Sequence, residues 1–298
     1  MITFTIGFGG QQIVLKKFKK YKYFYHIKAY FLDKKQYCYC TLRYNEKEIN
    51  DIEKIVNYKY KEITVIKTNI YNYKLIDWID NDKLSWSGLS LNPNAIQLLE
   101  KNQDKIYWPH LSENQYAIHL LEKNLDKIEW DNLSSNPNAI HLLENNKDKI
   151  NWYWLSSNQN AIHLLENNIY NVNWYWLSEN PNAIHMLKRN FHEIDWNELS
   201  RNPNAIQLLE ENQDKINWCW LSLNTAAVHL LENNPHKINW NWLSSNKNAI
   251  HLLEKKQDKI YWLYLSENPN AIHILEKNQD KIVWCRLSSN PSIFKLEY

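Results

Sequence analysis

Histidine recurs along the chain at a spacing of 22 residues. Seven members share this register: His119, His141, His163, His185, His229, His251 and His273. A metal ion needs several ligands within one coordination sphere, whereas successive packed helices lie about 8–10 Å apart. The ladder therefore predicts a polar surface stripe rather than a metal site. A partner protein could contact this stripe, and its imidazoles would gain charge together below about pH 6.5.

Tryptophans and one basic cluster offer two further candidate contact sets. Trp154, Trp176, Trp220 and Trp242 share a second register, which carries polar residues in other repeats. Because that register tolerates polar groups, we expect it at a surface or rim. Lys188 and Arg189 interrupt a face that is lined by Glu in other repeats. Both sets are candidates for partner binding, with drift of a single repeat as the alternative for the basic pair.

The region before the repeats contains lysines interleaved with aromatic residues. Lys16, Lys17, Lys19, Lys20 and Lys22 alternate with Phe and Tyr. Lysines can neutralise phosphates, and aromatic rings can stack on bases. These five lysines are therefore candidates for nucleic-acid binding. A β-strand with a solvated lysine face explains the same pattern and stays open as the alternative.

The other reactive side chains do not form a catalytic set. Cys38, Cys40, Cys219 and Cys285 have neither CxxC spacing nor a zinc-ligand pattern. The glycines within 7–10 are not followed by the Gly-Lys-Ser/Thr of a phosphate loop. We therefore predict no enzyme activity, no metal and no cofactor.

A tandem repeat of 22 residues determines where all these side chains lie. Its consensus is L-S-x-N-P-N-A-I-H-L-L-E-x-N-x-D-K-I-N-W-x-x, counted here as positions 1 to 22. A fixed period of this length indicates a solenoid or array. We divide the chain into a small basic α+β domain at 1–66 and a repeat solenoid at 67–298. The solenoid comprises a degenerate unit at 67–88, nine full units at 89–286 and a capping unit at 287–298.

Each unit reads as two short helices. Asn at position 4 before Pro is a helix start, and the apolar residues at positions 7, 8, 10 and 11 share one helical face. Asn at position 14 suits a left-handed residue that ends this helix. Position 19 then caps a second helix through Trp-x-x-Leu-Ser. We predict a mainly α fold, an elongated α-solenoid of short paired helices with the N-terminal α+β domain.

A leucine-rich-repeat-like βα coil is the alternative fold, because Ile150, Trp152 and Trp154 also alternate as in a strand. Stacked strands lie only about 4.8 Å apart, which leaves too little room for a helix in every coil. The charges repeat as well. Position 12 is usually Glu and position 17 usually Lys, and one unit inverts both to Lys188 and Glu193. This joint inversion predicts that the two positions face each other.

Charge is divided unevenly along the chain. Residues 1–66 contain 13 Lys or Arg against 6 Asp or Glu, whereas 67–298 contain 22 against 27. The repeats are therefore a poor match for a phosphate backbone. No apolar run reaches the ~20 residues that span a bilayer, and the first residues lack signal-peptide features. We expect an intracellular protein that does not interact with membranes.

The tandem L-S-x-N-P-N-A-I-H-L-L-E followed by D-K-I-N-W resembles the Asn-rich repeat proteins encoded by mimivirus-like giant DNA viruses. The resemblance covers about 67–298. It implies a viral origin and a location in the host cytoplasm or the virion. That family is largely uncharacterised, so the resemblance implies no activity.

Three functions are compatible with these features. The favoured one is a non-enzymatic scaffold that binds a protein partner on the extended solenoid surface. Nucleic-acid binding through the basic aromatic N-terminal segment is the first alternative. An adaptor that recruits partners to a host modification machinery is the second.

Overall fold

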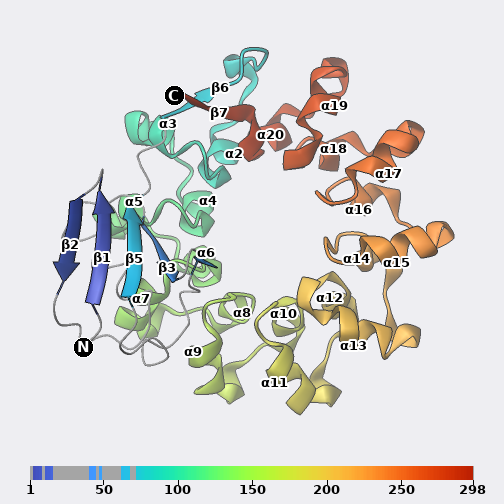
Figure 1. The fold of residues 1–298 in the computed structure, drawn as a ribbon, viewed down its shortest axis with the longest axis horizontal. Coiled ribbons are helices and arrows are strands. Elements are labelled where there is room, and N and C mark those ends of the chain that lie inside the picture. The colour runs from blue at the N-terminus through green and yellow to red at the C-terminus, as the bar shows by residue number, and fades with distance from the viewer. Residues whose placement is uncertain are drawn as a thin grey trace.

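The repeats fold into short helices that recur every 22 residues, packed one unit after another (Figure 1). The computed structural model describes residues 3–8, 11–15, 40–44, 47–48, 62–67 and 72–297, with side chains placed over 73–295. The predicted solenoid of short paired helices is confirmed. Between residues 76 and 293 the described chain contains helices and turns and no strand, so the βα coil is wrong.

Two rows of helices make up the array, and Figure 1 shows one row inside the other. The inner row comprises α2 (Trp86–Leu91), α4 (Trp108–Glu113), α6 (Trp130–Ser135), α8 (Trp152–Leu155), α10 (Trp174–Glu179), α12 (Trp196–Arg201), α14 (Trp218–Leu221), α16 (Trp240–Leu243), α18 (Trp262–Leu265) and α20 (Trp284–Leu287). The outer row comprises α3 (Ile96–Lys101), α5 (Ile118–Lys123), α7 (Ile140–Asn145), α9 (Ile162–Glu166), α11 (Ile184–Arg189), α13 (Ile206–Glu210), α15 (Val228–Asn233), α17 (Ile250–Lys255) and α19 (Ile272–Glu276).

A single 3-10 turn follows each outer helix and leads to the next inner helix. These turns are Gln103–Lys105, Leu125–Lys127, Lys147–Lys149, Ile169–Asn171, Phe191–Glu193, Gln213–Lys215, Pro235–Lys237, Gln257–Lys259 and Gln279–Lys281. A further one, Asn81–Lys83, precedes α2. Each full unit therefore contains at least three helical elements, one more than the sequence predicts, and Pro203–Ala205 and Pro269–Ala271 add a fourth in two units.

The asparagine at position 4 starts a short 3-10 helix as predicted at Asn202, Asn268 and Asn290. In the other units it acts differently from the prediction, as does the asparagine at position 14. Oδ1 of Asn158 accepts the backbone N–H of Asn160 at 3.0 Å and so holds a turn, and α9 begins only at position 8 of its unit. Asn146 has φ −133° and is not left-handed. Its Nδ2 instead donates to the carbonyl of Leu142 at 2.8 Å, capping the end of α7 from the side chain. Such side-chain bonds satisfy carbonyls that a helix end leaves free.

The asparagine at position 19 caps the inner helix as predicted in several units. In α8, Oδ1 of Asn151 accepts the backbone N–H groups of Tyr153 at 3.0 Å and Trp154 at 3.3 Å. Where position 19 is Tyr107 or Glu129, the helix forms without a side-chain cap. The repeat thus tolerates loss of this cap, because packing of the apolar face also stabilises a short helix.

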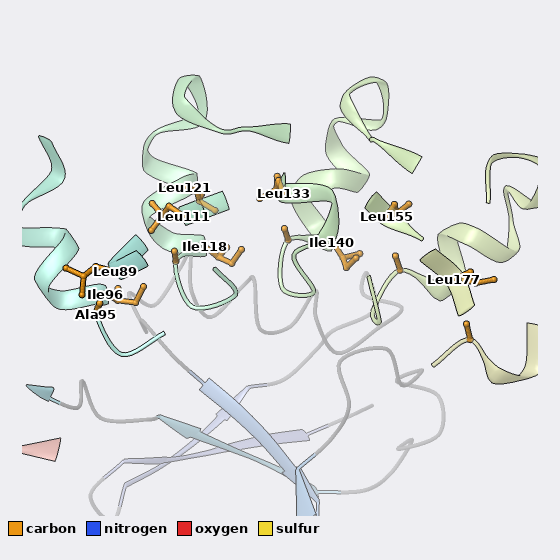
Figure 2. Close-up of a cluster of buried hydrophobic side chains, with 14 of the residues drawn as sticks. Leu89, Ala95, Ile96, Leu111, Ile118, Leu121, Leu133, Ile140, Leu155 and Leu177 are labelled. Carbon is orange, nitrogen blue, oxygen red and sulfur yellow. The ribbon is translucent and has the colours of Figure 1, made fainter. Parts of the chain in front are cut away.

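A continuous apolar core lies between the two rows. Leucines at position 1 are fully buried in every unit, and Figure 2 shows them following one another from Leu89 to Leu177 beside the isoleucines of the outer helices. Alanine at position 7 and leucine at position 11 are equally buried. No unit can bury its apolar face alone, so each interface contributes to one shared core.

Buried asparagine side chains connect each unit to the one before it. Nδ2 of Asn158 donates to the carbonyls of Ser134 and Asn136, both at 2.9 Å. Nδ2 of Asn160 donates to the carbonyl of Pro137, also at 2.9 Å. These bonds satisfy backbone acceptors that helix packing would otherwise bury without partners. Asparagine at position 4 is therefore a structural residue of the unit interface.

The array closes into a ring. Nδ2 of Asn92 in the first unit donates to the carbonyls of Ser288 at 3.0 Å and Asn290 at 2.9 Å in the last unit. The same first unit uses Asn94 to bond the carbonyl of Pro291 at 2.9 Å. These three bonds repeat the pattern found between neighbouring units. Figure 1 shows α20 beside α2, so the chain forms a closed ring rather than the expected elongated body.

A two-stranded ribbon adds to the closure. β6 (Asn72–Leu75) pairs antiparallel with β7 (Phe294–Glu297). Nζ of Lys295 also lies 2.9 Å from Oδ2 of Asp77. The two ends of the array therefore meet each other, and the segment after the last inner helix contacts the first unit.

Residues before the array contribute a separate sheet. Its strands are β1 (Thr3–Phe8), β2 (Gln11–Leu15), β3 (Cys40–Tyr44), β4 (Lys47–Glu48) and β5 (Glu62–Lys67). They lie in the order β2-β1-β5-β3-β4. Since much of 1–66 lies outside the described residues, the α+β domain with these boundaries stays a prediction.

Candidate functional site

The residues at position 22 lie on the inner row of helices, whose side away from the outer row we call the inner face. In each inner helix, positions 21 and 3 lie two residues from the buried leucine of position 1 and so roughly opposite it, whereas position 22 lies beside that leucine, about 100° round the helix. Going round the ring, position 22 is Gly88, His110, Asn132, Trp154, Trp176, Glu198, Trp220, Trp242, Tyr264 and Arg286. We call these ten residues the inner ladder. The ladder is aromatic from Trp154 to Tyr264 except at Glu198, and carries glycine or polar residues elsewhere.

Aromatic rings of the inner ladder contact one another across helices. The ring centroids of Trp154 and Trp176 lie 5.2 Å apart. Trp242 stacks on Trp220 at 5.2 Å and on Tyr264 at 4.7 Å, the latter pair tilted by only 14°. Stacked pairs of this kind add about 0.5–1.5 kcal/mol beyond area burial. The predicted surface position for these tryptophans agrees with their half-buried and exposed side chains.

An ionic cluster separates the two aromatic stacks. Nη1 of Arg201 lies 3.1 Å from Oε2 of Glu179 and 2.9 Å from Oε2 of Glu198. Its guanidinium carbon lies 5.1 Å from the ring centre of Trp220. Glu198 is only 1% exposed, and its Oε1 has no hydrogen-bond partner among the described residues. The inner row thus holds two carboxylates and one cation in contact, and of the three only Glu198 is buried.

Two pKa values record this environment. Burial raises the pKa of Glu179 to about 6, with Arg201 opposing and Glu198 adding to the shift. A side-chain hydrogen bond to Glu198, with burial, raises the pKa of Tyr175 to about 12. Both shifts favour the protonated form, because burial and a nearby negative charge disfavour a second anion. At position 3 of another unit, burial likewise raises the pKa of Glu267 against the opposing charge of Arg286.

The histidine ladder is internally paired. Each Nε2 lies 2.7–3.4 Å from a Glu at position 12 of the preceding unit. The pairs are His119–Glu100, His141–Glu122, His163–Glu144, His185–Glu166, His229–Glu210, His251–Glu232 and His273–Glu254. The stripe therefore links outer helices of neighbouring units. Its role in partner binding stays a prediction.

Lysines at position 17 do not face the glutamates, contrary to the sequence expectation. They lie over the tryptophan at position 20 of the preceding unit, with Nζ 4.2–5.0 Å from the ring centre. The pairs are Lys105–Trp86, Lys127–Trp108, Lys149–Trp130, Lys215–Trp196, Lys237–Trp218 and Lys281–Trp262, and Lys83–Trp284 across the closure. Cation–π attraction is the reason for this choice of partner. The joint inversion to Lys188 and Glu193 therefore has no basis in a direct pair.

The remaining candidates are not brought into the inner ladder. Lys188 and Arg189 are exposed in the last turn of α11, in the outer row. Lys16, Lys17, Lys19, Lys20 and Lys22 lie outside the described residues. The sequence also gave no notice of two inner-face tyrosines, Tyr153 and Tyr175 at position 21, which are 46% and 42% exposed. Their adjacency to Trp154 and Trp176 was the signal that could have identified them.

No helix among the described residues is long and apolar enough to cross a membrane. A protein family described as Periplasmic copper-binding protein (NosD) matches residues 56–290. No curated protein and no solved structure matches the chain.

This family match corrects two expectations from the sequence. The resemblance to giant-virus repeat proteins, made on the 22-residue motif, is wrong, because the family model that matches residues 56–290 is that of NosD. The expected intracellular location, in host cytoplasm or virion, is also wrong, because the matching family is periplasmic. That family has right-handed β-helices, and the present chain differs in building each coil from helices. Since the match covers most of its length, the chain belongs to the NosD family.

Proposed function

We propose that this protein is a non-enzymatic scaffold that binds a protein partner on the inner face of its ring. The supporting observation is the row of exposed aromatic side chains there: Tyr153 is 46% exposed, Tyr175 42% and Trp154 37%. Aromatic residues are enriched at protein interfaces, where one large rigid side chain supplies much contact area. The ring holds these side chains on short helices whose positions are fixed by the shared core.

The family that matches the chain is described as copper-binding. Copper sites use converging His, Cys, Met or carboxylate ligands. Over 73–295 no three of His, Cys, Asp and Glu converge in a way that could hold a metal ion. Cys219 accepts from Asn239 at 3.1 Å and Cys285 lies on another helix, α20. These residues do not fit a copper site, and no step of the proposal involves the metal.

The inner face is also a poor match for nucleic acid. Among the described residues at positions 21, 22 and 3, five carry carboxylates and two carry guanidinium groups: Glu113, Asp131, Glu179, Glu198 and Glu267 against Arg201 and Arg286. Phosphate backbones require the opposite balance. Nucleic-acid binding by the N-terminal lysines and the adaptor role stay predictions, since both depend on residues before the array.

Affinity purification from the cells that make the protein tests the scaffold. The full chain and its W154A/W242A double variant serve as baits, with mass spectrometry as readout. We expect a protein partner that the double variant loses, because both rings supply inner-face contact area. Phe191→Ala, an equally exposed aromatic on the outer layer (42%), is the matched control and should retain the partner. A partner kept by every bait would move the binding surface away from the inner face.

A further inference from the structure

The inner face contains a patch of partly exposed aromatic side chains that contact one another. Tyr153 and Trp154 of α8 contact each other edge to face at 5.3 Å, and Tyr175 of α10 contacts Trp176 in the same way at 5.2 Å. Tyr153 also reaches across to Trp176 at 5.5 Å. In the described segment 73–295, no lysine or arginine lies over Trp154. An exposed, electron-rich ring face without its own cation is therefore available there.

Carboxylates border this patch on the neighbouring helices. Oδ1 of Asp131 in α6 accepts from Nδ2 of Asn151 at 3.0 Å. Asn151 is the N-cap of α8, the helix that carries Tyr153 and Trp154. One helix further, Oε1 of Glu113 accepts from Nδ2 of Asn132 at 2.5 Å. Both acids are exposed. Asp131 thus lies on the helix next to Tyr153 and Trp154, and Glu113 lies on the helix beyond it.

Elsewhere on the inner row, an arginine of this chain lies between an aromatic ring and carboxylates. Arg201 rests against the ring of Trp220 while its guanidinium contacts Glu179 and Glu198. A planar guanidinium suits this arrangement, because it stacks on aromatic faces and donates to carboxylates at once. Trp154 is likewise an exposed ring with a carboxylate, Asp131, on the neighbouring inner helix, and no arginine of the described residues lies over it. Arg201 is therefore an internal example of the ligand that this patch fits.

We infer that Glu113, Asp131, Tyr153, Trp154 and Tyr175, the acidic-aromatic patch, bind arginine side chains of an extended segment from the protein partner. This inference rests on the proposed scaffold function and names the chemistry that its inner face recognises. Charge complementarity favours an arginine-bearing segment, since carboxylates outnumber cations over the whole inner face. Trp154 stacks on the guanidinium, and Asp131 accepts from it.

A direct binding assay with defined peptides tests this patch. The full chain is titrated with a fluorescent peptide of alternating arginine and glycine, and with its glutamate and lysine counterparts. We expect binding of the arginine peptide, weaker binding of the lysine peptide and none of the glutamate peptide. Trp154→Ala and the isosteric Asp131→Asn should each weaken arginine-peptide binding about fivefold. Raising the salt concentration should weaken it further.

Matched control variants distinguish peptide binding at the patch from non-specific attraction of a basic peptide to an acidic surface. Phe191→Leu on the outer layer and Glu276→Gln in α19 should leave peptide affinity unchanged, with circular dichroism confirming the fold of each variant. Equal peptide affinity for all variants would overturn the patch, as would no binding of the arginine peptide or binding of oligo-deoxythymidine that depends on Trp154. If a partner is captured through Trp154 and Trp242 while the arginine peptide fails, the scaffold stands and the arginine inference falls.

Discussion

Nδ2 of Asn92 donates to the carbonyl of Ser288 at 3.0 Å, although 196 residues separate them in the chain. Every unit interface of the array contains the equivalent bond, such as Asn114 to the carbonyl of Ser90 at 3.0 Å. The backbone N–H of Ser85 likewise donates to Oγ of Ser288 at 2.8 Å, as Tyr107 does to Ser90. The first and last units therefore use the ordinary interface of the repeat. The ring has no exposed apolar end that a capping unit would need to cover.

Gly88 is the position where closure leaves least space. A Cβ there would lie 2.6 Å from Cβ of Ser288 and 2.8 Å from the carbonyl oxygen of Cys285. We expect Gly88→Ala to destabilise the protein by about 1–3 kcal/mol through overpacking. The change otherwise raises helix propensity by roughly 1 kcal/mol, so any loss must come from the closing contact. Denaturant unfolding measures it.

Asn241→Ala, an exposed residue of another inner helix, is the control for that measurement and should be nearly neutral. Unchanged or higher stability of Gly88→Ala would mean that α2 and α20 do not pack as closely as described.

The asparagine at position 4 should be the most sensitive polar residue of the repeat. Asn158→Ala removes two interface bonds and leaves the buried carbonyls of Ser134 and Asn136 without these partners. We expect a loss of about 2–4 kcal/mol, since each unsatisfied buried polar group costs about 1–3 kcal/mol. Asn138→Ala loses one bond to the carbonyl of Gln115 at an exposed site and should cost under about 1 kcal/mol. Similar losses in the two variants would contradict the assignment of position 4 to the interface.

Most features of the fold that arise within one repeat unit could be predicted from the sequence, whereas features that arise between stacked units could not. The 22-residue period predicted the paired helices and their buried leucines, because periodicity within one unit determines which face is apolar. The turn held by Asn158 and the side-chain cap from Asn146 were missed, because both residues also favour standard helix caps. The pairing of His141 with Glu122 was also missed, because these residues lie 19 positions apart and meet only when neighbouring units stack.

Closure itself could not be predicted from one unit. A small rotation at each interface accumulates round the array, and only its total decides between an open coil and a ring. Gly88 was the one local sign, since it occupies a register that carries a larger side chain in every other unit. The acidic-aromatic patch could be predicted only in part. Trp154 was a candidate from the sequence, but the carboxylates come from other helices, and the sequence of one unit does not show which helices are neighbours.

Removing a unit tests the ring directly. Deletion of residues 243–264 joins Trp242 to Leu265 in register and leaves one fewer unit to complete the circle. Helicity per residue should persist, because each unit contacts only its neighbours. Amide hydrogen exchange over 85–94 should become faster, since the closing bonds of Asn92 and Asn94 can no longer be reached without strain. Retained protection there would show that closure adapts to the number of units.

Glu179 should make stability depend on pH in a defined window. Its pKa is raised from 4.5 to about 6, mainly by burial, so the folded protein binds this proton more tightly than the unfolded chain. The corresponding stability is fully present below about pH 4.5 and is lost as the pH rises through about 6. Glu179→Gln mimics the protonated form. At pH 7.5 it should match or exceed the parent by about 1–2 kcal/mol.

Unfolding of both proteins between pH 5 and 7.5 measures this difference, with Glu276→Gln on the outer row as the control. The gain should shrink towards pH 5, where Glu179 of the parent is itself largely protonated. Because the substituted amide keeps the shape of the side chain, a loss of stability at every pH would assign more weight to the 3.1 Å contact with Arg201 than to burial. The slope between pH 5 and 7.5 thus decides whether the carboxylates between the two aromatic stacks stabilise the ring or are tolerated within it.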